Sequence, residues 1–336
     1  MRSNGMARRK CIALFSGGLD SLLAVRVMRD AGVEVKILNF NIGFYFSQYE
    51  KKGNVLIYKG KVPEGYDIEV VDISGDFYEM IKNPAHGFGK NMNPCIDCKI
   101  FMLKKAKELL SAYGAGFVIT GEVLGQRPMT QNPRAMKLIE KESGLEGFLL
   151  RPLCAKKLQP TEPEKLGWVD REKMLGISGR SRKEQLALAE KWGMSDYVKT
   201  PAGGCILTDK EYSARLRDFL VHQGEDSISA DDVFLLTKGR HFRRDKIKFI
   251  IGRNKSENEA LIKYAGKGVL FECKKVPGPA ALGFGDLSAK DKEFIAAAAA
   301  GYSDGRDMEE VEITINNSES IRVKPLTLDE IKKYFI

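Results

Sequence analysis

Apolar and polar positions follow the rhythm of strand, helix, strand along the first 160 residues. Apolar runs of strand length lie at 10–15, 33–39, 68–72, 116–120 and 145–153. Helical spacing of apolar residues lies between them, at 20–31 and 98–113. A strand, a helix and a second strand within about thirty residues form the βαβ unit of parallel sheets. The pattern therefore predicts an α/β fold built on a doubly wound parallel sheet.

The pattern changes twice further along the chain. Residues 161–200 show helical pieces without strand signals, and Ser181 with Glu184 predicts a capping box at the start of SRKEQLALAEKWGM. A helix is predicted at 210–221. From about residue 231 a new unit begins, in which 232–254 predicts two strands joined by a basic turn and 256–265 a helix. The alanine run 296–300 predicts a buried helix.

These changes predict three segments. Residues 1–208 form the α/β domain, with a helical extension at 161–200, and 209–230 form a connecting helix and linker. Residues 231–336 form a smaller α+β domain.

Composition narrows the class of protein. Hydrophobic residues at 43% and charged residues at 29% are typical of a soluble globular chain. No apolar run approaches the ~18 residues of a membrane span, and the basic start MRSNGMARRK lacks a signal-peptide core. We therefore expect a cytoplasmic protein without a membrane partner.

The positive charge is concentrated in one segment. The net charge is +9, and residues 232–280 hold twelve Lys or Arg against five Asp or Glu. A basic cluster of this kind indicates a polyanionic partner such as nucleic acid, and the alternative is a solvated lysine-rich face.

The turn SGGLDS at 16–21 joins the first strand to the first helix. Two glycines let backbone N–H groups approach a ligand, and the helix N-terminus favours an anion. The turn has neither the lysine of a Walker A loop nor the GxGxxG spacing. Ser16 and Ser21 can donate hydroxyl hydrogen bonds, while Asp20 can cap the helix or hold Mg²⁺.

SGGLDS resembles the SGGxDS signature of the PP-loop ATP pyrophosphatases, which share an adenine nucleotide alpha hydrolase-like fold and split ATP into AMP and pyrophosphate. FVITGEVLGQRPMTQ resembles a loop of the 4-thiouridine synthetases (ThiI type), with Thr130 in place of Ser, and RPL at 151–153 resembles a later element of the same domain. A loop that follows a parallel strand faces the ligand crevice. Together the two resemblances imply a set of cofactor-binding residues: Ser16, Gly17, Gly18, Asp20, Ser21, Asn39, Thr120, Gly121, Glu122, Gly125 and Gln126.

Six cysteines in a chain of this kind favour metal or redox chemistry over disulfides. NPCIDCK places Cys95 and Cys98 at the start of a helix, and Cys205 in TPAGGC follows two glycines. This arrangement is similar to that of iron–sulfur-dependent tRNA thiolation enzymes, which implies that the three cysteines hold a [4Fe-4S] cluster with one open iron. The competing route is a persulfide relay between Cys98 and Cys205, and a structural pairing is the third alternative.

The resemblance covers residues 8–205, and neither a rhodanese domain nor a THUMP region is recognised. Sulfur would therefore come from hydrosulfide or from the persulfide of a cysteine desulfurase, and RNA would need another anchor. KIKFIIGRNKSENEAL resembles the GRNxxxN signature of the NFACT-R type domain, an RNA-associated module. With the basic turn before it, this implies a set of RNA-binding residues: Lys238, Arg240, Arg243, Arg244, Lys246, Arg253 and Asn254. The interleaved Phe242 and Phe249 could stack on unpaired bases.

The sequence therefore predicts an ATP-dependent tRNA sulfurtransferase. The enzyme would bind ATP and Mg²⁺, adenylate a uridine carbonyl with Asp20 in the site, and replace the oxygen with sulfur from the cysteine site. The resemblance favours 4-thiouridine. Three alternatives remain: a tRNA 2-thiouridylase with a cysteine relay, a PP-loop enzyme that inserts sulfur into a small molecule, and an RNA-binding module with a vestigial ATP site. tRNA is the expected partner, and a homodimer is compatible with the sequence.

Overall fold

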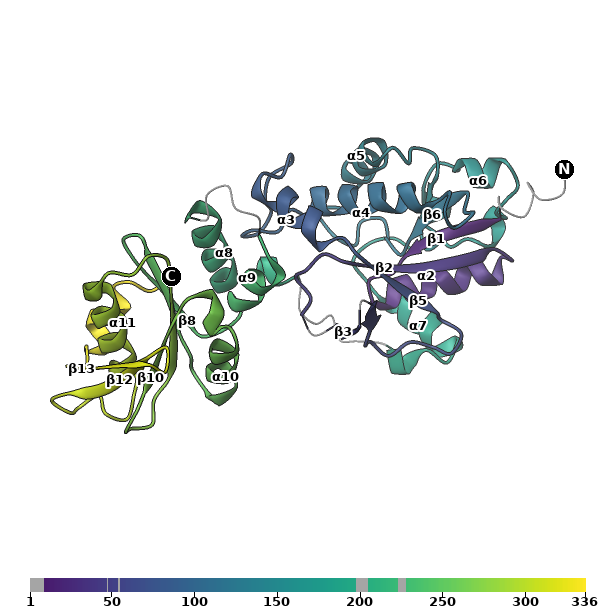
Figure 1. Cartoon of the computed structure of the whole chain (residues 1–336). Helices are drawn as coiled ribbons and strands as arrows, with labels where there is room; N and C mark the ends of the chain where they lie inside the picture. The colour runs from purple at the N-terminus through teal and green to yellow at the C-terminus, as the bar shows by residue number, and fades with distance from the viewer. Residues whose placement is uncertain (1–8, 47, 54, 198–204, 223–227) are drawn as a thin grey trace. The chain divides into compact units, whose positions relative to one another are not determined.

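A computed structural model describes residues 9–46, 48–53, 55–197, 205–222 and 228–336 of the chain (Figure 1). The chain divides into two compact units, residues 1–208 and 209–336. The predicted connecting segment 209–230 falls within the second unit. No helix in the described ranges is both long enough and apolar enough to cross a membrane.

A five-stranded parallel sheet forms the centre of the first unit. Its strands lie in the order β5-β2-β1-β6-β7, and every neighbouring pair is parallel. The bounds are β1 Lys10–Leu14, β2 Glu34–Asn41, β5 Ile68–Asp72, β6 Phe117–Thr120 and β7 Leu149–Leu150. A separate antiparallel pair consists of β3 (Tyr49–Lys52) and β4 (Val55–Tyr58). The predicted doubly wound α/β fold is confirmed.

Helices cover both faces of this sheet (Figure 1). On one face α2 packs against β1, β2, β6 and α7, and on the other α4 packs against β6 and α5. The bounds of the helices are α2 Leu19–Asp30, α3 Ser74–Lys82, α4 Cys95–Leu109, α5 Pro133–Ser143, α6 Glu162–Lys165 and α7 Lys183–Lys191. The central strand β1 is buried almost throughout because helices cover both of its faces, which explains its unbroken apolar run.

One predicted helix start is wrong. The N-cap of α7 is Arg182, and no side chain caps it. The Ser181 hydroxyl instead accepts a hydrogen bond from the Lys183 N–H at 3.3 Å. The helix thus begins after the serine rather than at it, and the predicted capping box between Ser181 and Glu184 does not form.

The second unit is built on a six-stranded antiparallel sheet. Its order is β13-β12-β10-β11-β9-β8. The strands are β8 Arg240–Arg244, β9 Ile247–Ile251, β10 Val269–Cys273, β11 Ala280–Phe284, β12 Val311–Ile315 and β13 Glu319–Val323. The helices are α8 Lys210–His222, α9 Ala230–Leu235, α10 Lys255–Lys263, α11 Ala289–Gly301 and α12 Leu328–Lys332.

Two apolar clusters hold this sheet between its helices. One joins the sheet to α11, whose alanines 296–300 are buried as predicted, and the other joins it to α9 and α10. The segment 232–254 differs from the expectation, because DVFLL lies in α9 and not in a strand. Ser229 and Asp232 make a capping box that starts this helix. The two strands are β8 and β9, and the residues expected in the basic turn form β8 itself.

Candidate active site

The predicted anion-binding turn lies at the carboxyl end of β1. Gly18 is the N-cap of α2, and no side chain caps that helix end. Gly17 has a φ of 75°, and a Cβ atom there would overlap the Tyr58 hydroxyl, so only glycine fits. The Ser21 hydroxyl donates to the Gly18 carbonyl at 2.7 Å and accepts from the Ser16 hydroxyl at 3.4 Å. An uncapped helix N-terminus beside a glycine turn suits an anion such as pyrophosphate.

The loop after β6 meets this turn. From β1 the sheet extends through β2 to β5 on one side and through β6 to β7 on the other, so β1 and β6 flank the switch point where doubly wound sheets bind ligands. A Cβ atom on Gly121 would lie 2.5 Å from the backbone carbonyl of Asp20 and 2.6 Å from the Ser21 nitrogen. The Gln126 amide donates to Asp20 Oδ2 at 2.7 Å. Two motifs a hundred residues apart therefore form one site.

Asp20 has one engaged oxygen and one without a partner. Its Oδ1 is buried and accepts no hydrogen bond within the described ranges. Burial raises the pKa of Asp20, while the Gln126 hydrogen bond and the charges of Arg182 and Arg127 oppose the rise. Asp20 does not cap α2, because Gly18 occupies the cap position. A carboxylate oxygen without a protein partner beside an anion-binding turn fits a Mg²⁺ ligand, the second role predicted for it.

Three side chains of this site carried no signal in the sequence. Arg127 and Arg182 place positive charge near Asp20. Gln185, on α7, is fully buried and donates from its amide to the Gln126 carbonyl oxygen at 3.0 Å. The chain of amides from Gln185 through Gln126 to Asp20 fixes the direction in which Gln126 donates. Locally, Gln185 differs from its neighbours only as a polar residue on the buried side of α7, which does not indicate a site.

The other predicted cofactor residues of the loop are engaged with protein groups. Glu122 is buried, and its Oε2 accepts from Arg151 at 3.1 Å and from Thr120 at 3.0 Å. Lys99 and Arg151 hold the pKa of Glu122 below its usual value despite its burial. Gly125 has a φ of 81°, and its N–H donates to the Gln131 carbonyl at 2.6 Å. These contacts shape the loop that carries Gln126.

Asn39, near the end of strand β2, is also hydrogen-bonded to protein groups. Its amide donates to the Phe15 carbonyl at 2.7 Å, and its carbonyl oxygen accepts from the Tyr49 hydroxyl at 2.7 Å. Asn39 therefore links the end of β1 to β3. The structure places this predicted cofactor-binding residue beside the SGGLDS turn.

The three predicted thiols come close together. Cys95 and Cys98 lie in the first turn of α4, which begins at Cys95. Burial raises the pKa of Cys98 to about 12, and the nearby thiols of Cys205 and Cys95 add to the rise while Lys99 opposes it. Burial also raises the pKa of Cys205, against hydrogen bonds from the Leu207 backbone and the Tyr45 hydroxyl. The glycines at 203 and 204, predicted to bring backbone close to a ligand, lie outside the described residues.

Hydrogen bonds from residues 91–93 connect the two segments that carry the cysteines. The Asn91 amide donates to the Thr208 carbonyl at 2.7 Å, and the Met92 N–H donates to the Leu207 carbonyl at 3.1 Å. The Asn93 amide donates to Cys95 Sγ at 2.9 Å. Lys99, next to Cys98, also lies 3.9 Å from Glu122 Oε1. The thiols thus share one region of the first unit with the loop that carries Gln126.

No set of three or more His, Cys, Asp or Glu side chains in the described part of the chain is gathered tightly around one point as a metal ion would need. The thiols of Cys95, Cys98 and Cys205 are near neighbours without such a tight arrangement. A cubane cluster is wider than a single ion, so its three thiolate ligands stand farther apart. The donor set therefore fits a cluster or a pair of relay thiols better than a zinc ion.

The remaining cysteines lie elsewhere. Cys11 is buried in β1, and Cys154 donates to the Glu122 carbonyl at 3.3 Å. Burial raises the pKa of Cys154 and of Cys273, in β10 of the second unit, each to about 11.

His86 holds the cysteine turn from outside. Its Nδ1 lies 3.0 Å from Asp97, the residue between Ile96 and Cys98, and its Nε2 lies 3.3 Å from Glu142. These carboxylates raise the pKa of His86. A raised pKa in the folded state means that the contribution to stability is complete below the unfolded value of about 6.5 and is lost as pH rises through the folded value.

We expect a His86→Gln variant to be less stable than wild type at pH 5.5 and to differ less from it at pH 8.5. The urea midpoints of both proteins at about these two pH values measure this change. His222→Gln, on the exposed end of α8, is the matched control. A difference between His86→Gln and wild type that is constant with pH would show that the ion pairs contribute nothing.

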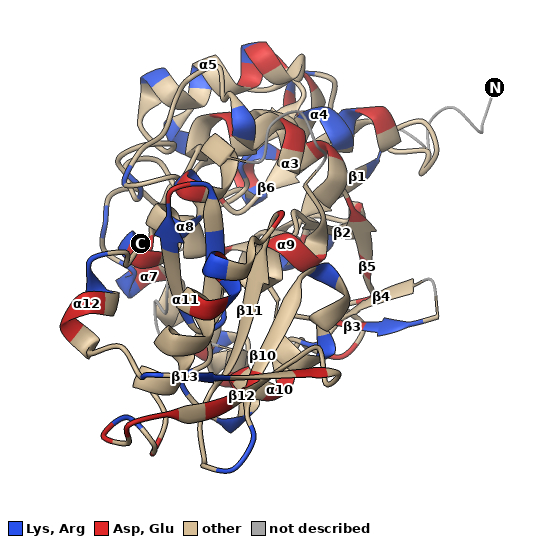
Figure 2. Ribbon diagram, turned by 60° about the vertical axis from the view of Figure 1, so that its left-hand side comes forward, with Lys and Arg blue, Asp and Glu red and all other residues tan. Residues whose placement is uncertain are grey.

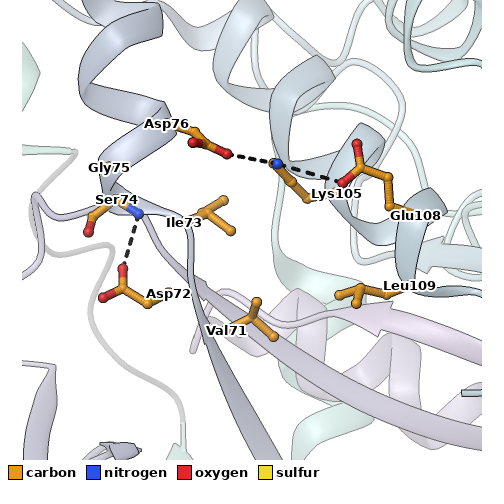
Figure 3. Close-up of a pocket in the computed structure, with 9 residues that line it drawn as sticks. All are labelled: Val71, Asp72, Ile73, Ser74, Gly75, Asp76, Lys105, Glu108 and Leu109. Carbon is orange, nitrogen blue, oxygen red and sulfur yellow. Dashed lines mark hydrogen bonds and ion pairs between the residues drawn. The ribbon is translucent and has the colours of Figure 1, made fainter. Parts of the chain in front are cut away.

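A groove of about 530 Å³ lies at the carboxyl end of β5, and none of the residues that line it is a predicted site residue. Its charged lining comes from α3 and α4, and Figure 3 shows Lys105 between Asp76 and Glu108. Lys105 Nζ lies 2.8 Å from Asp76 and 3.6 Å from Glu108. Since its single cation is already paired, the groove is not the candidate anion site.

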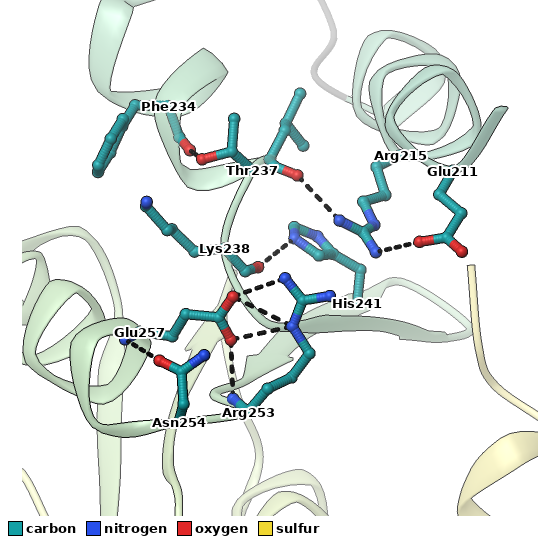
Figure 4. Close-up of polar contacts among 10 residues, drawn as sticks. Glu211, Arg215, Phe234, Thr237, Lys238, His241, Arg253, Asn254 and Glu257 are labelled. Carbon is teal, nitrogen blue, oxygen red and sulfur yellow. Dashed lines mark hydrogen bonds and ion pairs between the residues drawn. The ribbon is translucent and has the colours of Figure 1, made fainter. Parts of the chain in front are cut away.

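Some of the predicted RNA-binding residues have internal roles. Arg253 forms a two-pronged ion pair with Glu257, and Asn254 is the N-cap of α10, where it accepts from the Glu257 N–H (Figure 4). A Cβ atom on Gly252 would overlap Asn258, which accepts from the Ala280 N–H at 3.2 Å. The GRNxxxN signature is thus accounted for by local structure.

The basic residues of β8 divide into two groups. Arg243 is ion-paired with Asp218. Lys238, Arg240 and Arg244 lie over aromatic rings at the surface, at 4.5 Å from Phe234, 4.7 Å from Tyr302 and 4.2 Å from Phe294, and Lys246 is exposed. Phe242 and Phe249, predicted to stack on bases, stack on each other in the core with centroids 5.0 Å apart. Figure 2 shows acidic residues on α9 and β12 as well, so the basic surface of this unit is interrupted.

We therefore expect Arg244→Ala and Arg253→Ala to act differently. Arg244→Ala should weaken RNA binding by about 1 kcal/mol and reduce its salt dependence, because Arg244 is one of the residues predicted to contact phosphate. Arg253→Ala should lower the free energy of unfolding by about 1–3 kcal/mol, because it removes the ion pair of the buried Glu257 carboxylate. Filter binding to tRNA at two salt concentrations and urea unfolding measure the two effects. Equal loss of RNA affinity in both variants at full stability would contradict this division.

Two family models match the chain, one within each compact unit. Residues 6–159 match the family model of the thiamine biosynthesis protein (ThiI), and residues 239–335 match the model of the NFACT protein RNA binding domain. A solved C-terminal part of the fibronectin/fibrinogen-binding protein from Streptococcus suis is 18% identical, covers 47% of this chain and 79% of that one, and has a TM-score of 0.27. A TM-score this low does not establish a shared fold.

Three curated relatives each match part of the chain. A probable tRNA sulfurtransferase from Thermococcus kodakarensis is 29% identical over 144 residues, 43% of this chain and 36% of the relative. The tRNA-specific 2-thiouridylase MnmA from Petrotoga mobilis is 29% identical over 134 residues, 35% of this chain and 36% of the relative. A tRNA sulfurtransferase from Blochmanniella pennsylvanica is 28% identical over 148 residues, 44% of this chain and 29% of the relative.

The chain therefore spans only about a third of the length of these relatives. The two family matches cover different parts of the chain, and each falls within one of the compact units. Residues 6–159 form a ThiI-type domain, and residues 239–335 form an NFACT-type RNA-binding domain.

Proposed function

We propose that the protein is an ATP-dependent tRNA sulfurtransferase. The observation that carries the proposal is the hydrogen bond from Gln126 to Asp20, with Gly121 packed against the same turn. It joins an anion-binding turn to the loop that resembles thiouridine synthetases. The three neighbouring thiols supply a sulfur site in the same unit. The relatives named as tRNA sulfurtransferases support tRNA as the substrate.

The first half of the reaction is adenylation. The SGGLDS turn binds the pyrophosphate part of ATP, and the free Oδ1 of Asp20 would hold Mg²⁺ on the phosphate oxygens. The uridine carbonyl oxygen attacks the α-phosphorus, the N3 proton of the uracil is lost to solvent, and pyrophosphate leaves. The dipole of α2 and the charges of Arg127 and Arg182 stabilise the departing anion. The carbonyl oxygen has then become part of a phosphate ester, which is a better leaving group.

The second half replaces this oxygen with sulfur, and AMP leaves. Cys95, Cys98 and Cys205 would hold a [4Fe-4S] cluster, which supplies, when bound, an iron without a protein ligand for hydrosulfide. In the alternative relay, a cysteine desulfurase places sulfane sulfur on Cys98 or Cys205 as a persulfide. The terminal sulfur attacks the activated carbon, and the other thiol closes a disulfide that an external dithiol then reduces. We favour the cluster and 4-thiouridine as the product.

Cys95→Ala separates the two sulfur routes. A three-cysteine cluster needs Cys95, so this variant should lose both iron and sulfur transfer. The relay uses Cys98 and Cys205, so the same variant should keep sulfur transfer from a persulfide donor. Iron and sulfide counts after anaerobic purification accompany the activity measurement. Iron-free wild type that still thiolates tRNA would contradict the cluster.

The adenylation itself is tested by product release. Wild type should release AMP and pyrophosphate from ATP only when unmodified tRNA is present, and Asp20→Asn, which removes the charge that would hold Mg²⁺, should lose at least about 100-fold of this rate. A small-molecule enzyme would release pyrophosphate without tRNA, and a vestigial ATP site would release none. Either result would contradict the proposed function.

A further inference from the structure

Asn93 is a buried side chain with one unused hydrogen-bonding group. It is 4% exposed, and its amide nitrogen donates to Cys95 Sγ at 2.9 Å. Its Oδ1 is buried and accepts no hydrogen bond within the described part of the chain. A buried acceptor without a donor costs about 1–3 kcal/mol, so a native structure that keeps one calls for an explanation. Here the unused acceptor lies one amide group away from a thiol of the proposed sulfur site.

The Asn93 amide and a flexible side chain both lie close to Gly89. A Cβ atom on Gly89 would lie 3.3 Å from Asn93 Nδ2 and would overlap the Met129 thioether. A larger residue at position 89 would therefore displace the tip of Met129. Met129 belongs to the same loop as Gln126 and is 36% exposed. An unbranched methionine at the surface can move its tip at little cost.

The chemistry of uracil matches the unused acceptor. The N3–H group of uracil is a hydrogen-bond donor that lies between the two carbonyls at which sulfur can enter. Cytosine has an unprotonated nitrogen at the same position and cannot donate there. An enzyme that hydrogen-bonds a substrate N–H rejects analogues that lack it, because its own polar group is then left unpaired. A buried acceptor beside the sulfur site is therefore suited to recognise uracil.

We propose that Asn93 determines base specificity: its Oδ1 accepts the N3–H of the target uracil when the base binds, while its amide nitrogen keeps its hydrogen bond to Cys95. This inference rests on the proposed function. Since N3 adjoins both carbonyls, Asn93 selects uracil over cytosine and does not decide between 2-thiolation and 4-thiolation. It also places the reacting base within reach of Cys95.

The test compares the binding of two tRNAs to three forms of the full chain. One is a synthetic tRNA carrying uridine at the thiolated position, and the other carries 3-methyluridine there, which cannot donate. Affinity without ATP is compared because adenylation removes the N3 proton, so 3-methyluridine would react poorly in every variant. We expect wild type to bind the uridine tRNA at least about tenfold more tightly, the effect of one buried hydrogen bond. Asn93→Ala should bind the two alike within about twofold, since it lacks the acceptor and has room for the methyl group.

Asn93→Asp separates recognition from support of Cys95. Its carboxylate still accepts from N3–H but cannot donate to the sulfur, so it should keep the preference for uridine at a reduced rate. Asn83→Ala, at an exposed position of the same unit, is the matched control and should behave as wild type. Wild type that binds both tRNAs equally, or Asn93→Ala that keeps the full preference, would overturn the inference while leaving the proposed function intact. Wild type that does not thiolate the uridine tRNA would instead overturn the proposed function.

Discussion

A Cys98→Ala variant is expected to lose at least about 1000-fold of its sulfur transfer to tRNA, because both sulfur routes use this thiol and no other side chain can replace it. The nearby thiols of Cys205 and Cys95 both add to the raised pKa of Cys98. ATP binding should stay within about twofold of wild type, since Asp20 and Gln126 are untouched. Thiouridine per tRNA, measured by nucleoside mass spectrometry, gives the first quantity and ATP titration the second.

Cys273→Ala is the matched control for this result. Cys273 is a partly buried thiol of β10 in the second unit, and it is not among the cysteines of the predicted sulfur site. It should keep full activity. If Cys98→Ala thiolated tRNA at the wild-type rate, the three thiols would not be the sulfur site, and their closeness would be structural.

Gly121→Ala is expected to have the second largest effect. The new Cβ atom would lie 2.5 Å from the Asp20 backbone, so the loop after β6 and the SGGLDS turn would have to separate. Backbone cannot yield as a side-chain tip can, and we expect a loss of about 3 kcal/mol in the free energy of unfolding. The Gln126 hydrogen bond to Asp20 should weaken with it, so the affinity for ATP should fall by at least about tenfold.

Urea unfolding and ATP titration measure these two losses. Gly75→Ala is the control, because a Cβ atom there meets nothing within 4 Å and α3 should tolerate alanine without loss. Full stability and full ATP affinity in Gly121→Ala would mean that the close approach of the two motifs has no role in the site.

The sequence was informative where function depends on backbone geometry over a few residues. SGGLDS and the loop at 120–131 could be located because each follows an apolar strand, and parallel strands bring their carboxyl ends to one edge. The start of α4 at Cys95 followed from Asn93 and Pro94 before it. The βαβ rhythm predicted the parallel sheet for the same reason, since strands buried on both faces need continuous apolar runs.

Pairings between distant segments could not be predicted. Nothing local to Asn93, Gln185 or His86 shows which groups they contact, because these contacts depend on the register of loops and helices far apart in the chain. DVFLL was expected as a strand because short apolar runs are typical of strands. The structure has a helix there, which starts at the capping box formed by Ser229 and Asp232. Arg253 and Asn254 were expected to bind RNA because they match the GRNxxxN signature. The sequence does not reveal that their partners are groups within the protein.

The measurement that tests the central claim most directly is thiouridine formation by the whole chain in vitro. Anaerobically purified protein would be incubated with unmodified tRNA, sulfide, Mg²⁺ and either ATP or a non-hydrolysable analogue, and the nucleosides analysed by mass spectrometry. The site geometry predicts thiouridine in the ATP sample alone, accompanied by AMP and pyrophosphate. Unmodified uridine throughout, from protein that binds both ATP and tRNA and is supplied in turn with sulfide and with a persulfide donor, would contradict it.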